Sequence, residues 1–176
     1  MGNNRDDYPG LIAAVSEIDI ARLAAYIDGE GTIYINVVNG LRGGMKTPQY
    51  MLSLIITNTD PRFMNWLKEK FDGSVYHVKY EKCKHLGTKP IMRWQLNERM
   101  ASVVLSRCVP YMIMKKPQAE IGLAFMLLKR SRKIGDRNSK GQVKSFPLSE
   151  SEISQRHAMK LEIERINKSV ISASIQ

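Results

Sequence analysis

The residue in this sequence best suited to do chemistry is Glu30, a carboxylate set between two glycines. Before it, residues 18–27 repeat apolar side chains at the 3.6-residue period of a helix. After it, residues 32–38 alternate apolar and polar side chains as a half-buried strand does. Because carboxylate oxygens bind hard divalent cations, a carboxylate at this helix–strand junction predicts a metal ligand.

Two features of the junction support that interpretation. Asp28 and Glu30 both stand at the negative end of the predicted helix dipole, which costs about 0.3–1 kcal/mol for each charge. A bound divalent cation would offset that repulsion. Gly29 and Gly31 suit a tight helix exit, because glycine adopts positive φ without penalty.

Caps and turn residues divide the remaining chain into helices and strands. Ser16 is a predicted N-cap with Asp19 three residues later, and Ser149 with Glu152 predicts a second capped helix. The predicted elements are a helix up to Asp28, strands at 32–38 and 49–58, a helix from Asp60-Pro61 to Gly73, strands at 74–80 and 91–97, and helices at 98–108, 117–132 and 150–168.

Charge indicates the class of partner. The chain of 176 residues carries a net charge of +10, and residues 32–148 alone hold 21 Lys and Arg against 7 Asp and Glu. Such a surplus is typical of surfaces that bind polyanions, nucleic acid above all, with an anionic membrane as the competing partner. No membrane-spanning run or signal peptide is recognised, so we expect a soluble, intracellular protein.

The nine residues at 23–31, LAAYIDGEG, resemble the signature of the LAGLIDADG homing endonucleases without a gap. Glu30 occupies the eighth, acidic position, while Ala25 and Tyr26 depart from the Gly and Leu of the family pattern. The resemblance implies an α+β fold of order αββαββα, with a four-stranded antiparallel, saddle-shaped sheet and additional C-terminal helices. We expect an N-terminal arm at 1–15, the endonuclease core at 16–132, and a basic loop and C-terminal helix at 133–176.

The resemblance also implies an activity. A single signature implies a homodimer that makes double-strand breaks in a long pseudo-palindromic DNA site, leaves 5′ phosphates and promotes mobility of a host intron. Glu30 and the Gly29 carbonyl would hold Mg²⁺, with Mn²⁺ able to substitute and Ca²⁺ supporting binding without cleavage. An organelle or the bacterial cytoplasm is the location implied.

Two further residues acquire expected catalytic roles from the resemblance. Lys115 aligns with a family lysine that acts as general base or charge stabiliser, and Lys116 takes its place if the register shifts by one. Asp60 aligns with a position that orders active-site water, but Asp-Pro at a helix start equally predicts an N-cap.

The signature helices would cross at the dimer axis, where small side chains permit close approach. The expected interface residues are Ala21, Ala24, Ala25 and Asp28. The competing interpretation is that these small residues only pack the helix against its own sheet.

DNA readout is expected from strand side chains that face away from the core, with basic hairpin tips on phosphates. The expected strand residues are Tyr34, Asn36, Ser53, Thr57, Lys79, Arg93 and Gln95, and the expected tip residues are Arg42, Lys46, Lys82 and Lys84. Two alternatives stay open: a maturase or DNA-binding regulator of the same fold without cleavage, and an unrelated RNA-binding module with aromatic stacking platforms.

Overall fold

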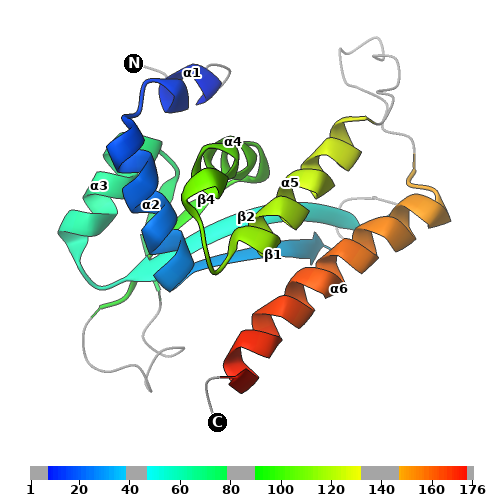
Figure 1. The fold of residues 1–176 in the computed structure, drawn as a ribbon. Coiled ribbons are helices and arrows are strands. Elements are labelled where there is room, and N and C mark those ends of the chain that lie inside the picture. The colour runs from blue at the N-terminus through cyan, green and yellow to red at the C-terminus, as the bar shows by residue number, and fades with distance from the viewer. Residues whose placement is uncertain (1–7, 39–46, 79–89, 132–146, 174–176) are drawn as a thin grey trace.

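The computed structural model of the chain describes residues 8–38, 47–78, 90–131 and 147–173 (Figure 1). The elements in these ranges follow the predicted order, with a short helix added at the start. They are α1 (Tyr8–Ala13), α2 (Glu17–Glu30), β1 (Gly31–Val38), β2 (Gln49–Asn58), α3 (Pro61–Phe71), β3 (Ser74–His77), β4 (Met92–Leu96), α4 (Glu98–Cys108), the 3₁₀ turn η4 (Val109–Tyr111), α5 (Lys116–Arg130) and α6 (Glu150–Ala173).

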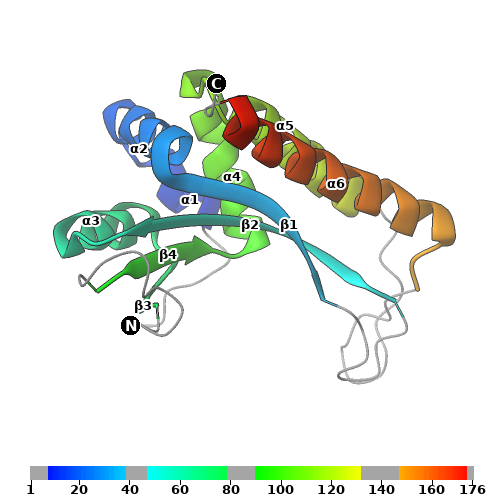
Figure 2. The same cartoon turned by 90° about the horizontal axis from the view of Figure 1, so that it is seen from below.

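The described strands form one antiparallel sheet in the order β1-β2-β4-β3. Side chains of β1 and β4 alternate between buried and more exposed positions, so one face of the sheet carries the core. Figure 2 shows α2, α4, α5 and α6 on that same side of the sheet. The predicted α+β class, with a four-stranded antiparallel sheet, is therefore confirmed.

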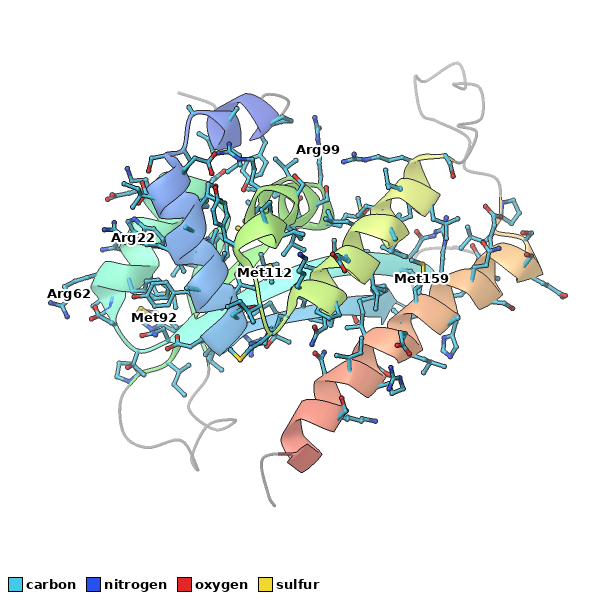
Figure 3. The ribbon with its side chains drawn as sticks, viewed as in Figure 1. Arg22, Arg62, Met92, Arg99, Met112 and Met159 are labelled. Atoms are coloured by element: carbon cyan, nitrogen blue, oxygen red, sulfur yellow. The ribbon has the colours of Figure 1, made fainter. Side chains whose placement is uncertain are left out.

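The core lies between this sheet face and the helices. Ile33 of β1, Leu54 of β2 and Trp94 of β4 are almost fully buried there. Helix α6 closes the β1 side through the buried Ile163 and the half-buried Met159, labelled in Figure 3.

In the segment expected as an N-terminal arm at 1–15, the described residues from Tyr8 onward include the helix α1, which packs against the rest of the chain. Tyr8 and Ile12 of α1 are buried, and the Tyr8 hydroxyl donates to the carbonyl of Phe71 at 2.7 Å. Arg107 of α4 donates to the Ile12 carbonyl at 3.0 Å. Helix α1 thus belongs to the core.

Both predicted caps are confirmed. The Ser16 hydroxyl accepts from the Asp19 amide at 3.2 Å, which starts α2. At α6, Ser149 accepts from the Glu152 amide at 3.2 Å, and the Glu152 carboxylate accepts from the Ser149 amide at 2.8 Å, which completes a capping box. In the described residues, no helix is both long and apolar enough to cross a membrane.

Candidate metal and nucleic-acid site

Helix α2 ends at Glu30 and β1 begins at the next residue, so the predicted helix–strand junction is confirmed. The sequence analysis expected glycine at positions 29 and 31 because glycine tolerates positive φ, but neither residue has positive φ in the structure. Glycine is therefore present at these positions for other reasons. A Cβ on Gly31 would lie 2.7 Å from the Cα and the carbonyl oxygen of Ile27, so close backbone approach excludes a side chain. A Cβ on Gly29, in contrast, would have no heavy atom of the described chain within 4 Å, so the space beside the helix end is open.

The carboxylate of Glu30 is exposed and is oriented by a neighbour that the sequence did not suggest. Asn58, the last residue of β2, donates its Nδ2 to Glu30 Oε2 at 2.6 Å. The Asn58 Oδ1 accepts from the Asp60 amide at 2.9 Å, which fixes the orientation of the Asn58 side-chain amide. The one feature of the sequence that could have pointed to Asn58 as a partner of Glu30 is its position at the end of the predicted second strand.

Asp60 lies one step further along this chain of contacts and acts as the N-cap of α3. Its carboxylate accepts from the Arg62 amide at 2.8 Å and pairs with the Arg62 guanidinium at 2.6 Å. These hydrogen bonds from Arg62 lower the pKa of Asp60 to about 2. Figure 3 shows Arg62 extending outward from α3. The capping role predicted for Asp60 is confirmed.

Asp28 and Lys115 are joined by hydrogen bonds at the end of α2. The buried Asp28 carboxylate accepts from the Ile113 amide at 2.6 Å and from the Lys115 amide at 2.8 Å. In return, Lys115 Nζ donates to the Asp28 carbonyl at 2.7 Å and to the Ile27 carbonyl at 3.0 Å. The predicted residue Lys115 therefore stands at the carbonyl end of the signature helix, next to the turn that carries Glu30.

This arrangement changes the electrostatic interpretation of the junction. A cation near a helix C-terminus is favourable, so the Lys115 ammonium relieves part of the repulsion that the sequence assigned to a metal. Burial lowers the pKa of Lys115, and the Asp28 charge acts in the opposite direction. The site thus combines an exposed carboxylate, an orienting amide and a half-buried lysine.

The described residues predicted to read DNA all lie on one face of the sheet. The register pairs Tyr34 with Ser53 and Asn36 with Met51, and these residues alternate with the buried Ile33 and Ile35. This open face is the one opposite the helices. It contains Tyr34, Asn36, Ser53, Thr57, Arg93 and Gln95, as predicted, and also Thr32, Met51, Ile55, Ser74 and Tyr76, which the sequence analysis did not select.

Among the described residues predicted to read DNA, Ser53 is the most enclosed, with 7% of its surface exposed. Five of the residues predicted to bind DNA, the strand residue Lys79 and the four tip residues, lie outside the described residues. They are Arg42, Lys46, Lys79, Lys82 and Lys84.

The predicted interface residues of α2 divide into two groups. Ala25 is exposed and Ala21 half-buried, so both are accessible to a partner. Ala24 is fully buried in the core of its own chain, and the Asp28 carboxylate bonds to its own chain's backbone. Ala24 and Asp28 therefore pack within their own chain, as the competing interpretation expects.

A scan of protein-family models finds no match to this sequence, and neither does a search of curated proteins. The fold does have similar solved structures. The homing endonuclease I-CvuI, crystallised with its target in the presence of Ca, aligns with a TM-score of 0.62 and 16% identity over 85% of this chain and 82% of its own.

Two other homing endonucleases align over different shares of their length. The archaeal intron-encoded I-Vdi141I, complexed with DNA, has a TM-score of 0.54 and 12% identity over 86% of this chain and 98% of its own. The meganuclease I-SmaMI, bound to DNA, has a TM-score of 0.56 and 16% identity over 81% of this chain and 43% of its own. The chain therefore has the fold of the LAGLIDADG homing endonucleases.

Proposed function

We propose that this protein is a site-specific DNA endonuclease that cuts both strands of a long pseudo-palindromic site as a homodimer, with Mg²⁺, and so promotes mobility of a host intron. The observation that carries the proposal is at the end of α2, where Glu30 of the signature is exposed and the half-buried Lys115, from the start of α5, donates to the carbonyls of the same helix end. Paired acidic and basic groups of this kind serve phosphodiester hydrolysis.

Duplex DNA would lie on the open sheet face. In its described part that face carries polar side chains on β1, β2 and β4, together with Arg93 and the apolar Met51 and Ile55, and side chains at alternate strand positions suit readout of base edges in the major groove. The surplus of basic residues at 32–148 would supply phosphate contacts. Solved neighbours of the same fold are bound to DNA, which supports this choice of ligand.

The donor set at the junction fits Mg²⁺. Mg²⁺ takes oxygen ligands, and nucleases commonly bind it through one or two carboxylates together with phosphate oxygens and water. Glu30 offers an exposed carboxylate, and the open space beside Gly29 leaves its surroundings accessible. Glu30 and the Gly29 carbonyl would hold the ion, which when bound stabilises the attacking hydroxide and the leaving 3′ oxygen.

The other residues of the site would each have a separate task. Asn58 holds one carboxylate oxygen of Glu30 and so fixes the direction in which the carboxylate faces. Lys115 would stabilise the negative charge that develops on the scissile phosphate. The backbone N–H of Asp60 sets the orientation of the Asn58 side-chain amide, so Asp60 would act on Glu30 through Asn58. Asp60 would also order water near the cut.

We propose a homodimer because two copies of the chain would provide one active site for each of the two cuts. This chain has one copy of the signature, and it spans most of I-Vdi141I but less than half of I-SmaMI. A second copy of this chain would supply the second active site and would match the longer I-SmaMI chain in extent. Two signature helices, crossing at Ala21 and Ala25, would bring two Glu30 side chains together.

The test is cleavage of a randomised duplex library by the purified protein in Mg²⁺, beside Glu30→Gln and the matched control Glu69→Gln. Glu69 is an exposed carboxylate on α3, away from the junction. We expect wild type and Glu69→Gln to enrich one cut site with 5′ phosphates, in Mg²⁺ or Mn²⁺. Glu30→Gln should lose cleavage but keep binding, measured with Ca²⁺.

Two outcomes would contradict the proposal. Tight binding of DNA without cleavage by the wild type in either metal would favour a maturase or regulator of the same fold. Cleavage that survives in Glu30→Gln would remove Glu30 from the metal site.

A further inference from the structure

Tyr76 of β3 and Gln95 of β4 form a hydrogen-bonded pair on the open sheet face. We infer that Tyr76 fixes the side-chain amide of Gln95, so that Gln95 reads a DNA base as a hydrogen-bond donor and selects guanine over adenine. The inference rests on the proposed function, because it assumes that this face binds duplex DNA.

The sheet register places the pair beside Arg93. Tyr76 stands opposite Arg93, and Ser74 stands opposite Gln95, so their side chains project from the same face. Tyr76 is 41% exposed, and Arg93 and Gln95 are half-buried. The three side chains therefore form one accessible patch at the β3–β4 end of the sheet.

The hydrogen bond between the two side chains has a direction. The Tyr76 hydroxyl donates to Gln95 Oε1 at 2.8 Å. The amide oxygen is thus engaged within the protein, and Nε2 presents its two N–H groups on the other side of the amide. In the described part of the chain, no residue accepts a hydrogen bond from that Nε2.

Arg93 adds donors to the same patch. Its Nε is buried and has no acceptor among the residues that the structure describes. An arginine offers five N–H donors and no acceptor. The buried Nε cannot itself reach a ligand, so the donors of the patch are the terminal N–H groups of Arg93 together with Gln95 Nε2, and a ligand that suits the patch must present acceptors.

Base chemistry then distinguishes the purines. A glutamine that is free to turn recognises adenine with both ends of its amide, donating to N7 and accepting from the N6 amino group. Guanine presents the two acceptors N7 and O6 on the same edge. The amide oxygen keeps a second lone pair, but the bond from Tyr76 turns that oxygen towards β3 and leaves Nε2 as the end of the amide that meets the DNA. The adenine pairing, which needs the oxygen, is therefore disfavoured, and donation to guanine is kept.

Spacing along β4 predicts a second guanine nearby. Arg93 and Gln95 are two residues apart on one strand, which is about 7 Å. Two base-pair steps of DNA are also about 7 Å, and arginine pairs with both guanine acceptors. Each half-site should therefore carry guanine at two positions that are two steps apart.

The experiment selects bound DNA from a randomised duplex library with the full-length protein in Ca²⁺, followed by sequencing. The variants are Tyr76→Phe, Gln95→Ala and the control Tyr111→Phe, which removes an exposed tyrosine hydroxyl that bonds to Glu17 instead. We expect the wild type to favour guanine over adenine by about tenfold at the Gln95 position. Tyr76→Phe should reduce that ratio to about twofold or less, Gln95→Ala should abolish the preference, and Tyr111→Phe should change neither, with thermal midpoints unchanged throughout.

A guanine preference that persists in Tyr76→Phe would overturn the inference, as would a motif that Gln95→Ala leaves unchanged. Both results leave DNA binding intact and therefore leave the proposed function standing. Absence of any enriched sequence with the wild type would instead overturn the proposed function together with this inference.

Discussion

At the scale of single residues, the contact between Asp28 and Lys115 explains an arrangement that looks unfavourable in the sequence. An aspartate near a helix C-terminus opposes the helix dipole. Here its carboxylate accepts two backbone N–H groups of the segment before α5, and the Lys115 ammonium binds the helix carbonyls. Asp28 thus fixes the backbone from which Lys115 reaches the site.

We predict that Asp28→Asn destabilises the fold by about 2 kcal/mol, because one of two amides loses its acceptor and meets an N–H₂ donor. Urea denaturation measures this loss. Cleavage should also fall by about 10–100-fold, since a displaced Lys115 is poorly oriented, while DNA affinity in Ca²⁺ stays unchanged. A loss of affinity that matches the loss of cleavage would contradict a positioning role for Asp28.

Asp60 predicts a pH dependence of stability. Its pKa falls from the ordinary value of 3.8 to about 2 because Arg62 donates hydrogen bonds to the carboxylate. A carboxyl group whose pKa is lower in the folded state stabilises the fold above its unfolded pKa, and the contribution disappears as the pH falls through the folded pKa. Asp60→Asn should therefore be less stable than wild type at pH 7, and the two should converge between pH 3.8 and about 2. Thermal midpoints across that pH range would show it, and a constant difference down to pH 2 would argue against the assignment.

At the scale of elements, periodicity and capping predicted most of the fold. The second strand was predicted at 49–58 and β2 spans Gln49–Asn58, because its alternation and its turn residues agree. Helix α1 was missed because six residues are too few to display a helical period, and its stability comes from burial of Tyr8 and Ile12. Asn58 was missed because its contact with Glu30 joins residues 28 positions apart, and no local pattern encodes that contact.

The glycines at the α2–β1 junction allow a matched pair of substitutions. Gly31→Ala should destabilise the protein by about 1–3 kcal/mol, because its Cβ would collide with the Ile27 backbone. Gly29→Ala should leave stability equal or raise it by up to about 1 kcal/mol, since the position is helical and open. Chemical denaturation of both variants compares them directly. Equal losses at the two positions would contradict close backbone approach as the reason for Gly31.

At the scale of the whole molecule, one face of the sheet forms the core and the opposite face is left open for a ligand. Helices cover one face and form the core, while the other face carries Arg93 and the described polar residues that are predicted to meet DNA. The end of α2 lies where the helical layer meets β1, so Glu30 is held by the core and still exposed. A second copy that packs against α2 would extend the open face into one continuous surface with two carboxylates at its centre.

That assembly predicts the effect of a single charge on the exposed side of α2. We expect the wild type to sediment at about 40 kDa, twice the 20.0 kDa of one chain. Ala25→Arg should sediment as a monomer with an unchanged thermal midpoint, because Ala25 is exposed in one chain and two arginines would face each other across the axis. The monomer should lose double-strand cleavage.

Ala158→Arg is the matched control, because Ala158 is an exposed alanine on α6, away from the signature helix. It should remain a dimer and retain cleavage. If Ala25→Arg stays dimeric, the interface lies elsewhere than on α2. If the wild type is a monomer at the concentration where it cuts both strands, a single Glu30 must serve two scissile phosphates in turn, and nicked DNA should then accumulate before linear product.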